Sequence, residues 1–177
     1  HAHIFELELT LTQPQSPQVL SLPAWIPGSY MIREFSKNIV EIHASDDSGN
    51  CQITKLDKHT WSVHTQGGSL RIRYTVYAWD LSVRMAHFDQ NHAYFNGTSV
   101  FLKAHGFEDS AHQVQIHAPI GTQYADWRIA TTLQAQHDDP TQFGTFSATD
   151  YDDLIDHPVE IADYTRIEFE ACGVPHE

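Results

Sequence analysis

Histidine is the residue of this chain best suited to chemistry, because it occurs thirteen times and its imidazole both binds metals and moves protons. The densest group lies in AHFDQNH, which contains His87, Asp89 and His92. Zinc needs three or four ligands converging at about 2.0–2.3 Å, usually with two of them on a regular spacing such as i, i+4 of a helix. AHFDQNH is typical of a loop instead, and on a strand the odd separation of His112 and His117 would place them on opposite faces. We therefore expect scattered surface histidines, with no metal site and no cofactor in this chain.

No recognised catalytic motif occurs in the sequence. H-E-x-x-H, G-x-S-x-G, the P-loop and G-x-G-x-x-G are all missing, and the His176-Glu177 pair follows a strand pattern rather than opening a helix. Serines and histidines are plentiful, but a catalytic triad requires convergence in space that a sequence does not show. We expect no catalytic residue here.

YFNGTSVF, residues 94–101, carries the strongest local structural signal. Asn96-Gly97 is the favoured pair for a type I′ two-residue hairpin, and strand-forming residues flank it. We predict a tight β-hairpin at this point. Its tip would present small polar groups, so that Asn96, Thr98 and Ser99 could line a cleft while remaining part of the turn.

A stiff aromatic turn is predicted at LPAWIPGSY, residues 22–30. Pro23 and Pro27 each fix φ and lack a backbone N–H, which argues against a central strand. Pro27-Gly28 fits positions i+1 and i+2 of a type II turn, where the second residue needs φ > 0. Local chemistry alone indicates a structural corner with Trp25 packed beneath it.

Short strands position these motifs. In IFELELTLT, apolar residues occupy every second position from Phe5 to Leu11, the period of a sheet with one solvated face. Similar patterns, separated by turn-rich segments, predict strands at 19–25, 39–44, 52–56, 61–65, 70–79, 100–104, 113–117, 145–148 and 164–171. Many short strands without long helices indicate an all-β fold, either an antiparallel β-sandwich or a saddle-shaped sheet domain, with one or two short helices.

Two segments have a helical pattern. MIREFSKNI spaces its apolar residues for a helix, although the preceding turn leaves an extended conformation open. TDYDDLIDHP is clearer, because Thr149 or Asp150 can cap a helix, acidic residues suit its first turn and Pro158 stops it.

Composition and charge exclude several classes of function. The 177 residues carry a formal net charge of −13, which disfavours nucleic acids and anionic membrane surfaces as partners. No apolar run approaches the roughly 20 residues of a membrane-spanning helix. The acidic residues between 138 and 177 could instead attract a basic partner surface or the cationic end of a substrate. Cys51 and Cys172 match no metal or redox spacing, so we expect reduced thiols and a cytoplasmic protein, with the periplasm as the alternative.

Three blocks together resemble a known family. LPAWIPGSYMIREFSKNI, VRMAHFDQNHAYFNGTSVFL and YDDLIDHPVEI look like the signature blocks of the N-terminal domain of glycyl aminopeptidase-type metallopeptidases, in order and spacing, over about residues 20–161. The resemblance implies a β-rich N-terminal domain followed by a thermolysin-like zinc catalytic domain and often a PDZ domain. It assigns residues 1–170 to the N-terminal β domain and 171–177 to the start of the connection to the catalytic domain.

The same resemblance implies a non-catalytic role. The zinc would be held by the catalytic domain, and this chain would pack on that domain and help to form the cleft for the N-termini of peptide substrates. The candidate cleft residues are Tyr94, Asn96, Gly97, Thr98 and Ser99, with Asn96 Oδ1 or a backbone carbonyl accepting the ammonium group.

The aromatic turn then has a candidate role in docking. The residues expected to contact the catalytic domain are Trp25, Pro27, Gly28, Tyr30, Arg33 and Glu34. A turn that is already ordered loses little entropy when it docks, and we expect Trp25 and Tyr30 to be partly exposed.

A different class of protein also fits the sequence. A free-standing β-sandwich that binds carbohydrate or a protein ligand could use tryptophans as stacking platforms. The candidates are Trp25, Trp61, Trp79 and Trp127, although burial is the usual fate of tryptophan in strands.

Overall fold

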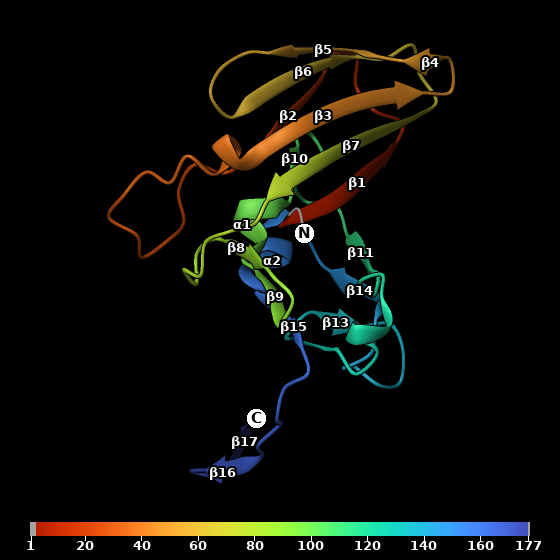
Figure 1. Ribbon diagram of the computed structural model, residues 1–177. Helices are drawn as coiled ribbons and strands as arrows, with labels where there is room; N and C mark the ends of the chain where they lie inside the picture. The colour runs from red at the N-terminus through yellow and green to blue at the C-terminus, as the bar shows by residue number, and fades with distance from the viewer. Residues whose placement is uncertain (1–2, 177) are drawn as a thin grey trace.

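The structure is a computed structural model that describes residues 3–176, and its upper half contains two four-stranded antiparallel sheets (Figure 1). The first has the order β1 (Ile4–Thr12), β7 (Ser69–Tyr77), β3 (Ile39–Asp46) and β4 (Gly49–Asn50). The second has the order β10 (Lys103–Ala104), β2 (Gln18–Ser21), β6 (Thr60–His64) and β5 (Gln52–Lys55).

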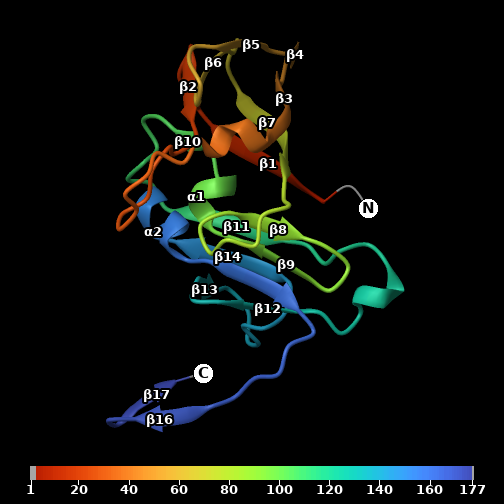
Figure 2. The ribbon, with the colours of Figure 1, turned by 60° about the vertical axis from the view of Figure 1, so that its left-hand side comes forward.

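The lower half contains two further antiparallel sheets (Figure 2). One has the order β12 (Arg128–Thr131), β15 (Val159–Ala162), β9 (His92–Phe95) and β8 (Ala86–Phe88). The other has the order β11 (His112–Ile116), β14 (Gly144–Ala148) and β13 (Gln134–Ala135). The hairpin of β16 (Phe169–Ala171) and β17 (Val174–His176) stands away from the body (Figures 1 and 2).

Helical structure is short. The helical elements are α1 (Gly97–Val100), α2 (Tyr151–Asp156) and the 3₁₀ helices η1 (Phe35–Asn38) and η2 (Thr122–Tyr124). The helices α1 and α2 lie at the junction of the two halves, whereas η2 lies in the lower half (Figures 1 and 2). Side chains from both halves form a single hydrophobic cluster, which runs from Leu70 and Ile72 of β7 to Phe146 of β14 and Val159 of β15. The prediction of an all-β domain with antiparallel sheets and short helices is confirmed.

Most predicted strands are present, and their deviations have local causes. β2 ends at Ser21, before Pro23, because proline supplies no hydrogen-bond donor to a ladder. The strand predicted at 100–104 begins only at Lys103, and the one predicted at 164–171 only at Phe169. The sequence patterns missed β12 and β15, which have four residues each.

Two other local predictions are confirmed. Asp150 caps α2, since its side chain accepts a hydrogen bond from Asp153 N–H at 2.8 Å. At the aromatic turn, Gly28 has φ +79° and Ser29 N–H donates to Ile26 O at 3.2 Å, which fits a turn with Pro27-Gly28 at its centre. The helical interpretation of MIREFSKNI holds only for its second half, where η1 forms.

The hairpin predicted at Asn96-Gly97 is wrong. Asn96 has φ −88° and ψ 130°, whereas a type I′ turn needs positive φ there. It instead caps α1, and Gly97 lies so close to α2 that a Cβ atom would come within 2.7 Å of Ile155 Cα. Glycine is required here by helix packing, a tertiary constraint that the dipeptide signal does not contain.

The loop predicted for AHFDQNH is also wrong. This segment is a hairpin of β8 and β9, in which His87 pairs with Tyr94 and Phe88 with Ala93. Asp89 Oδ1 accepts hydrogen bonds from Asn91 N–H at 2.7 Å and His92 N–H at 3.0 Å. The aspartate therefore builds the turn that reverses the chain.

Two observations bear on the environment of the protein. Among residues 3–176, no helix has the length and apolar character needed to cross a bilayer. Cys51 and Cys172 are both free thiols.

Asp46, at the end of β3, should make the stability of the upper half depend on pH. Hydrogen bonds from Gln66 N–H and Ser48 N–H, and a further one from Thr65, lower the pKa of Asp46 from 3.8 to about 2. Because the folded pKa lies below the unfolded one, the stabilisation is complete above about pH 4 and is lost as the pH falls toward 2. We expect Asp46→Asn to be less stable than wild type at pH 6 in urea unfolding, with the difference shrinking toward pH 2. A difference that stays constant with pH would contradict this assignment.

Candidate functional site

One face of the β8–β9–β15 sheet gathers polar side chains. Tyr94 of β9 lies directly opposite His87 of β8 and Glu160 of β15. Directly opposed residues of antiparallel strands point to the same face, so these three side chains are neighbours. The alternate residues, Phe95 and Ile161 among them, are buried in the core. The alternation of the strands thus separates a polar face from an apolar one.

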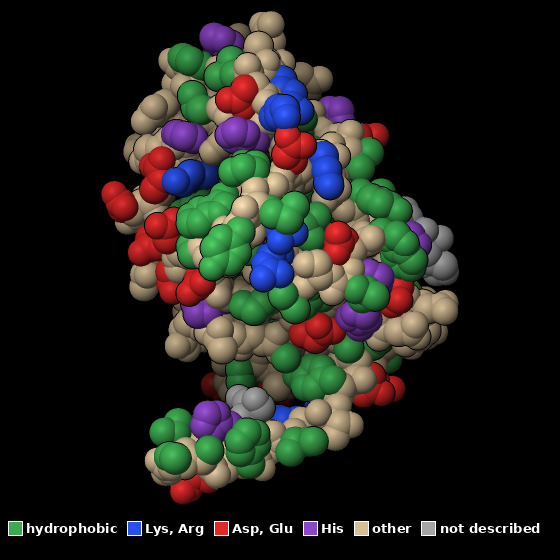
Figure 3. Space-filling model, turned by 90° about the vertical axis from the view of Figure 1, so that its left-hand side faces the viewer, with side chains coloured by type: hydrophobic (Ala, Val, Ile, Leu, Met, Phe, Trp, Pro, Cys, Tyr) green, Lys and Arg blue, Asp and Glu red, His purple; other side chains and the backbone are tan. Residues whose placement is uncertain are grey.

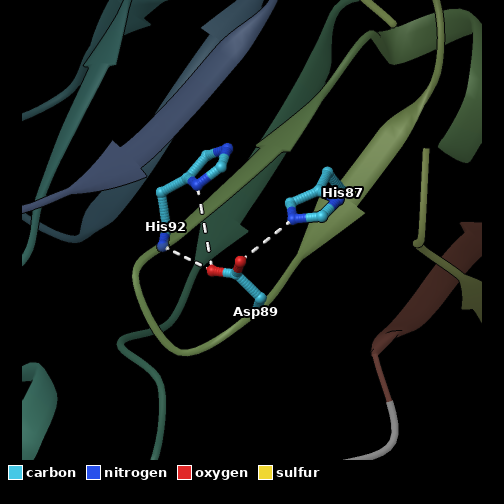
Figure 4. A group of neighbouring side chains, drawn as sticks. All are labelled: His87, Asp89 and His92. Atoms are coloured by element: carbon cyan, nitrogen blue, oxygen red, sulfur yellow. Dashed lines mark hydrogen bonds and ion pairs between the residues drawn. The ribbon is translucent and has the colours of Figure 1, made fainter. Parts of the chain in front are cut away.

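His87, Asp89 and His92 converge at the end of this face, where the β8–β9 hairpin turns (Figure 4). His87 Nε2 lies 3.3 Å from Asp89 Oδ2, and His92 Nδ1 lies 3.8 Å from Asp89 Oδ1. The two imidazole rings stack at 4.9 Å between centroids. The structure therefore brings the three side chains of this segment together in space, where the sequence alone favoured surface histidines without a metal site.

His87 is the least exposed member of the group. Only 4% of the residue is accessible, and its ring stacks on Trp79 at 4.9 Å as well as on His92. Its approach to Asp89 has the distance of an ion pair, but neither ring nitrogen makes an aligned hydrogen bond to any described residue. Buried polar groups normally make hydrogen bonds that offset the loss of contact with water, and the ring nitrogens of His87 lack such bonds to the described residues.

The carboxylates of this face are held in different environments. Hydrogen bonds from the backbone N–H groups of Asn91 and His92, with the nearby His87, lower the pKa of Asp89 to about 2. Burial raises the pKa of Glu160, against the opposing influence of the two imidazoles. Burial, together with the charge of Glu160, raises the pKa of the Tyr94 hydroxyl.

The candidate cleft residues are largely engaged within the domain. Tyr94 O–H donates to Val83 O at 2.7 Å, and Asn96 Oδ1 accepts from Thr98 N–H at 3.1 Å and from the Thr98 hydroxyl. Thr98 and Ser99 are buried, and Gly97 lies against α2. A role for these five residues in a cleft stays a prediction.

The Trp25 loop, which we define as residues 23–34, projects from the junction of the two halves (Figure 1). Trp25 is 49% exposed and Tyr30 is fully exposed, as we expected. Met31 and Ile32 are also exposed, and hydrophobic side chains gather on this face of the molecule with acidic ones toward its margin (Figure 3). Docking by the Trp25 loop stays a prediction.

Internal hydrogen bonds give the Trp25 loop a fixed shape. Trp25 Nε1–H donates to Ser29 O at 2.7 Å, and Arg33 N–H donates to Ala24 O at 2.6 Å. Arg33 Nε–H also donates to Ser29 Oγ at 3.3 Å, and Glu34 pairs with Lys58 at 2.5 Å. Glu34, one of the residues expected to contact the catalytic domain, therefore already has a partner inside this domain.

The tryptophans divide into two pairs. Trp61 and Trp127 are core residues, whereas Trp25 and Trp79 are about half exposed. Burial of two of the four proposed platforms weakens the interpretation as a free-standing carbohydrate-binding module.

Sequence reasoning missed Glu160 and the importance of Trp79. In VEIA the carboxylate stands between Val159 and Ile161, and this alternation was a signal for a strand with Glu160 on its polar face. The position of Trp79 over His87 depends on the pairing of residues 79 and 87, which no local pattern contains.

Comparisons with known proteins identify the class. The family model for the peptidase M61 N-terminal domain matches residues 1–163. A crystal structure of an aminopeptidase N family protein from Idiomarina loihiensis superposes with a TM-score of 0.93 at 40% identity, over 99% of this chain and 30% of that one. None of the curated proteins searched is a significant match. The fold and these matches define the N-terminal domain of a metallopeptidase. The chain belongs to the peptidase M61 N-terminal domain family.

Asn96 provides a test of the cap that replaces the predicted hairpin. We expect Asn96→Ala to lower the free energy of unfolding by about 0.5–2 kcal/mol, because Thr98 N–H loses its acceptor. Asn96→Asp retains an acceptor and should unfold close to wild type. Urea unfolding of the two variants beside wild type makes the comparison, and equal stability of all three would contradict a capping role.

Proposed function

We propose that this chain is the non-catalytic N-terminal domain of a zinc-dependent aminopeptidase. In this proposal the domain packs on the catalytic domain of the same polypeptide and helps to form the cleft that receives peptide N-termini. Membership of the peptidase family supports the proposal. The chain spans 30% of the related crystal structure, so that the activity and substrates of the whole protein belong to the proposal as well.

The Trp25 loop is the observation that carries the proposal. Four large apolar side chains stand exposed on it, namely Trp25, Tyr30, Met31 and Ile32. Large exposed apolar side chains that lie together are typical of an interaction surface, whereas single exposed ones are ordinary. Because hydrogen bonds already fix the loop, docking would cost little conformational entropy.

The polar face of β9 and β15 supports the cleft part of the proposal. The ammonium group of a peptide N-terminus needs an acceptor, preferably an anionic one. Asn96 Oδ1 is occupied by the α1 cap, whereas the Glu160 carboxylate lies half-buried opposite Tyr94. Glu160 is therefore the better acceptor on this face, with Tyr94 beside it.

The catalytic zinc of the proposed enzyme would be held outside this chain. The resemblance implies two histidines and a glutamate on an H-E-x-x-H helix and its neighbour, and this sequence has no such motif. The zinc would activate the attacking water. The contribution of this chain is to bind and orient the substrate.

The first test separates the domain from its proposed parent. With added Zn²⁺, the 177-residue chain should release no glycine or alanine from dipeptides, because it lacks the H-E-x-x-H motif, whereas the full-length protein should. Amino-acid release is measured by chromatography at equal molar concentrations. Hydrolysis by the chain alone would contradict a non-catalytic role. A parent gene with no H-E-x-x-H downstream would contradict the aminopeptidase assignment.

The second test concerns the Trp25 loop in the full-length protein. Tyr30→Ser with Ile32→Ser should weaken packing between domains by about 3–6 kcal/mol, on the basis of about 1.5–3 kcal/mol for each large apolar side chain. We expect calorimetry to show the domains unfolding at separate temperatures, together with a lower kcat/KM. Ile120→Ser is the matched control, since Ile120 is 99% exposed and lies outside the loop. If the double variant behaves like this control, the loop does not dock.

A further inference from the structure

We propose that His87, Asp89 and His92 form a binding site for a divalent transition-metal ion, with Zn²⁺ as the best fit. This inference replaces the expectation that the chain holds no metal. Three observations support it. The three donor side chains converge, the buried His87 ring lacks hydrogen bonds to the described residues, and the β8–β9 turn fixes the positions of the ligands.

The donor atoms are close to the separation that a metal requires. Two ligands at 2.0–2.1 Å from a tetrahedral ion are about 3.3 Å apart. His87 Nε2 and Asp89 Oδ2 are 3.3 Å apart, His92 Nδ1 lies 3.8 Å from Asp89 Oδ1, and all the donors fall within 4.8 Å of one another.

The donor types select the class of ion. Two imidazoles and one carboxylate suit zinc and its neighbours in the transition series, whereas Mg²⁺ and Ca²⁺ prefer oxygen ligands. Three protein ligands leave a fourth position open to water or to an external ligand. That position would face a surface hollow that the three ligands share with Trp79, Leu81 and Asn91.

His87 supplies an independent observation. The residue is 96% buried, its ring points at Asp89 (Figure 4), and neither ring nitrogen makes a hydrogen bond with the described residues. An unsatisfied buried polar group lowers the stability of the fold, because burial strips it of hydrogen bonds to water. A metal ion on Nε2 would remove that cost for one of the two nitrogens.

The hairpin orders the ligands before an ion arrives. Asp89 Oδ1 holds the backbone of the turn through Asn91 N–H and His92 N–H, which leaves Oδ2 directed toward His87. The stack of Trp79, His87 and His92 restricts both rings. A preformed set of ligands binds more tightly, because less conformational freedom is lost.

Zinc titration of the untagged, EDTA-stripped chain by isothermal calorimetry tests the site. We expect saturable binding of one Zn²⁺ that excess Mg²⁺ or Ca²⁺ does not displace. His92→Ala and Asp89→Asn should weaken Zn²⁺ binding at least about tenfold, since each removes one of three ligands. Asp89→Asn keeps an oxygen acceptor for the turn, and the buried His87 is left unchanged to protect folding.

His43→Ala is the matched control. His43 is exposed and lies 3.8 Å from the Glu41 carboxylate, so that it repeats an imidazole–carboxylate pair without a third ligand among residues 3–176. This variant should bind Zn²⁺ like wild type. Absence of saturable binding to wild type, or equal affinity in wild type and in both ligand variants, would overturn the proposal.

Thermal unfolding distinguishes a metal site from a hairpin brace. Saturating Zn²⁺ should raise the melting temperature of wild type and His43→Ala, by mass action, but not that of His92→Ala. If instead His92→Ala is destabilised equally with and without Zn²⁺, the cluster serves only to brace the β8–β9 turn and the proposal fails. Quenching of Trp79 fluorescence by Cu²⁺, lost in Trp79→Phe, would locate the ion beneath that ring.

Discussion

The register of β9 between β8 and β15 is the constraint on which the polar face depends. Phe95 pairs with Ala86 and Val159, and these buried residues fix how far each strand slides along its neighbours. A shift of one residue would turn the apolar side chains outward and send Tyr94 into the core. Core packing thereby decides which polar groups meet on the other face, and the chemistry of the site follows from hydrophobic burial rather than from polar attraction.

Much of the fold could be predicted from local patterns, because those patterns have local causes. Alternation of apolar and polar residues predicted β1 and β7, and a capping aspartate predicted the start of α2. A proline-glycine pair predicted the turn in the Trp25 loop. The Asn96-Gly97 prediction failed because the same dipeptide also serves a helix start packed against Ile155. Local signals are decisive only where no distant segment competes for the same residues.

The candidate site was less accessible to sequence reasoning than the fold. His87, Asp89 and His92 were noticed as a group, but their convergence depends on a turn that Asp89 itself builds. Glu160 lies far from them in sequence and reaches the same face only through strand pairing. Exposure of Trp25 and Tyr30 was expected from the docking role that the family resemblance implies, whereas local chemistry alone had predicted Trp25 packed beneath the turn. The sequence patterns did not predict which strands distant in the chain pair with one another.

The exposed apolar side chains of the Trp25 loop also affect how the molecule behaves in solution. Two copies that meet through Tyr30 and Ile32 would adhere, yet each carries a formal charge of −13. Mutual repulsion between such surfaces keeps copies apart over the Debye length, about 8 Å at physiological ionic strength. The negative charge of the surface therefore opposes self-association through the apolar side chains of this loop.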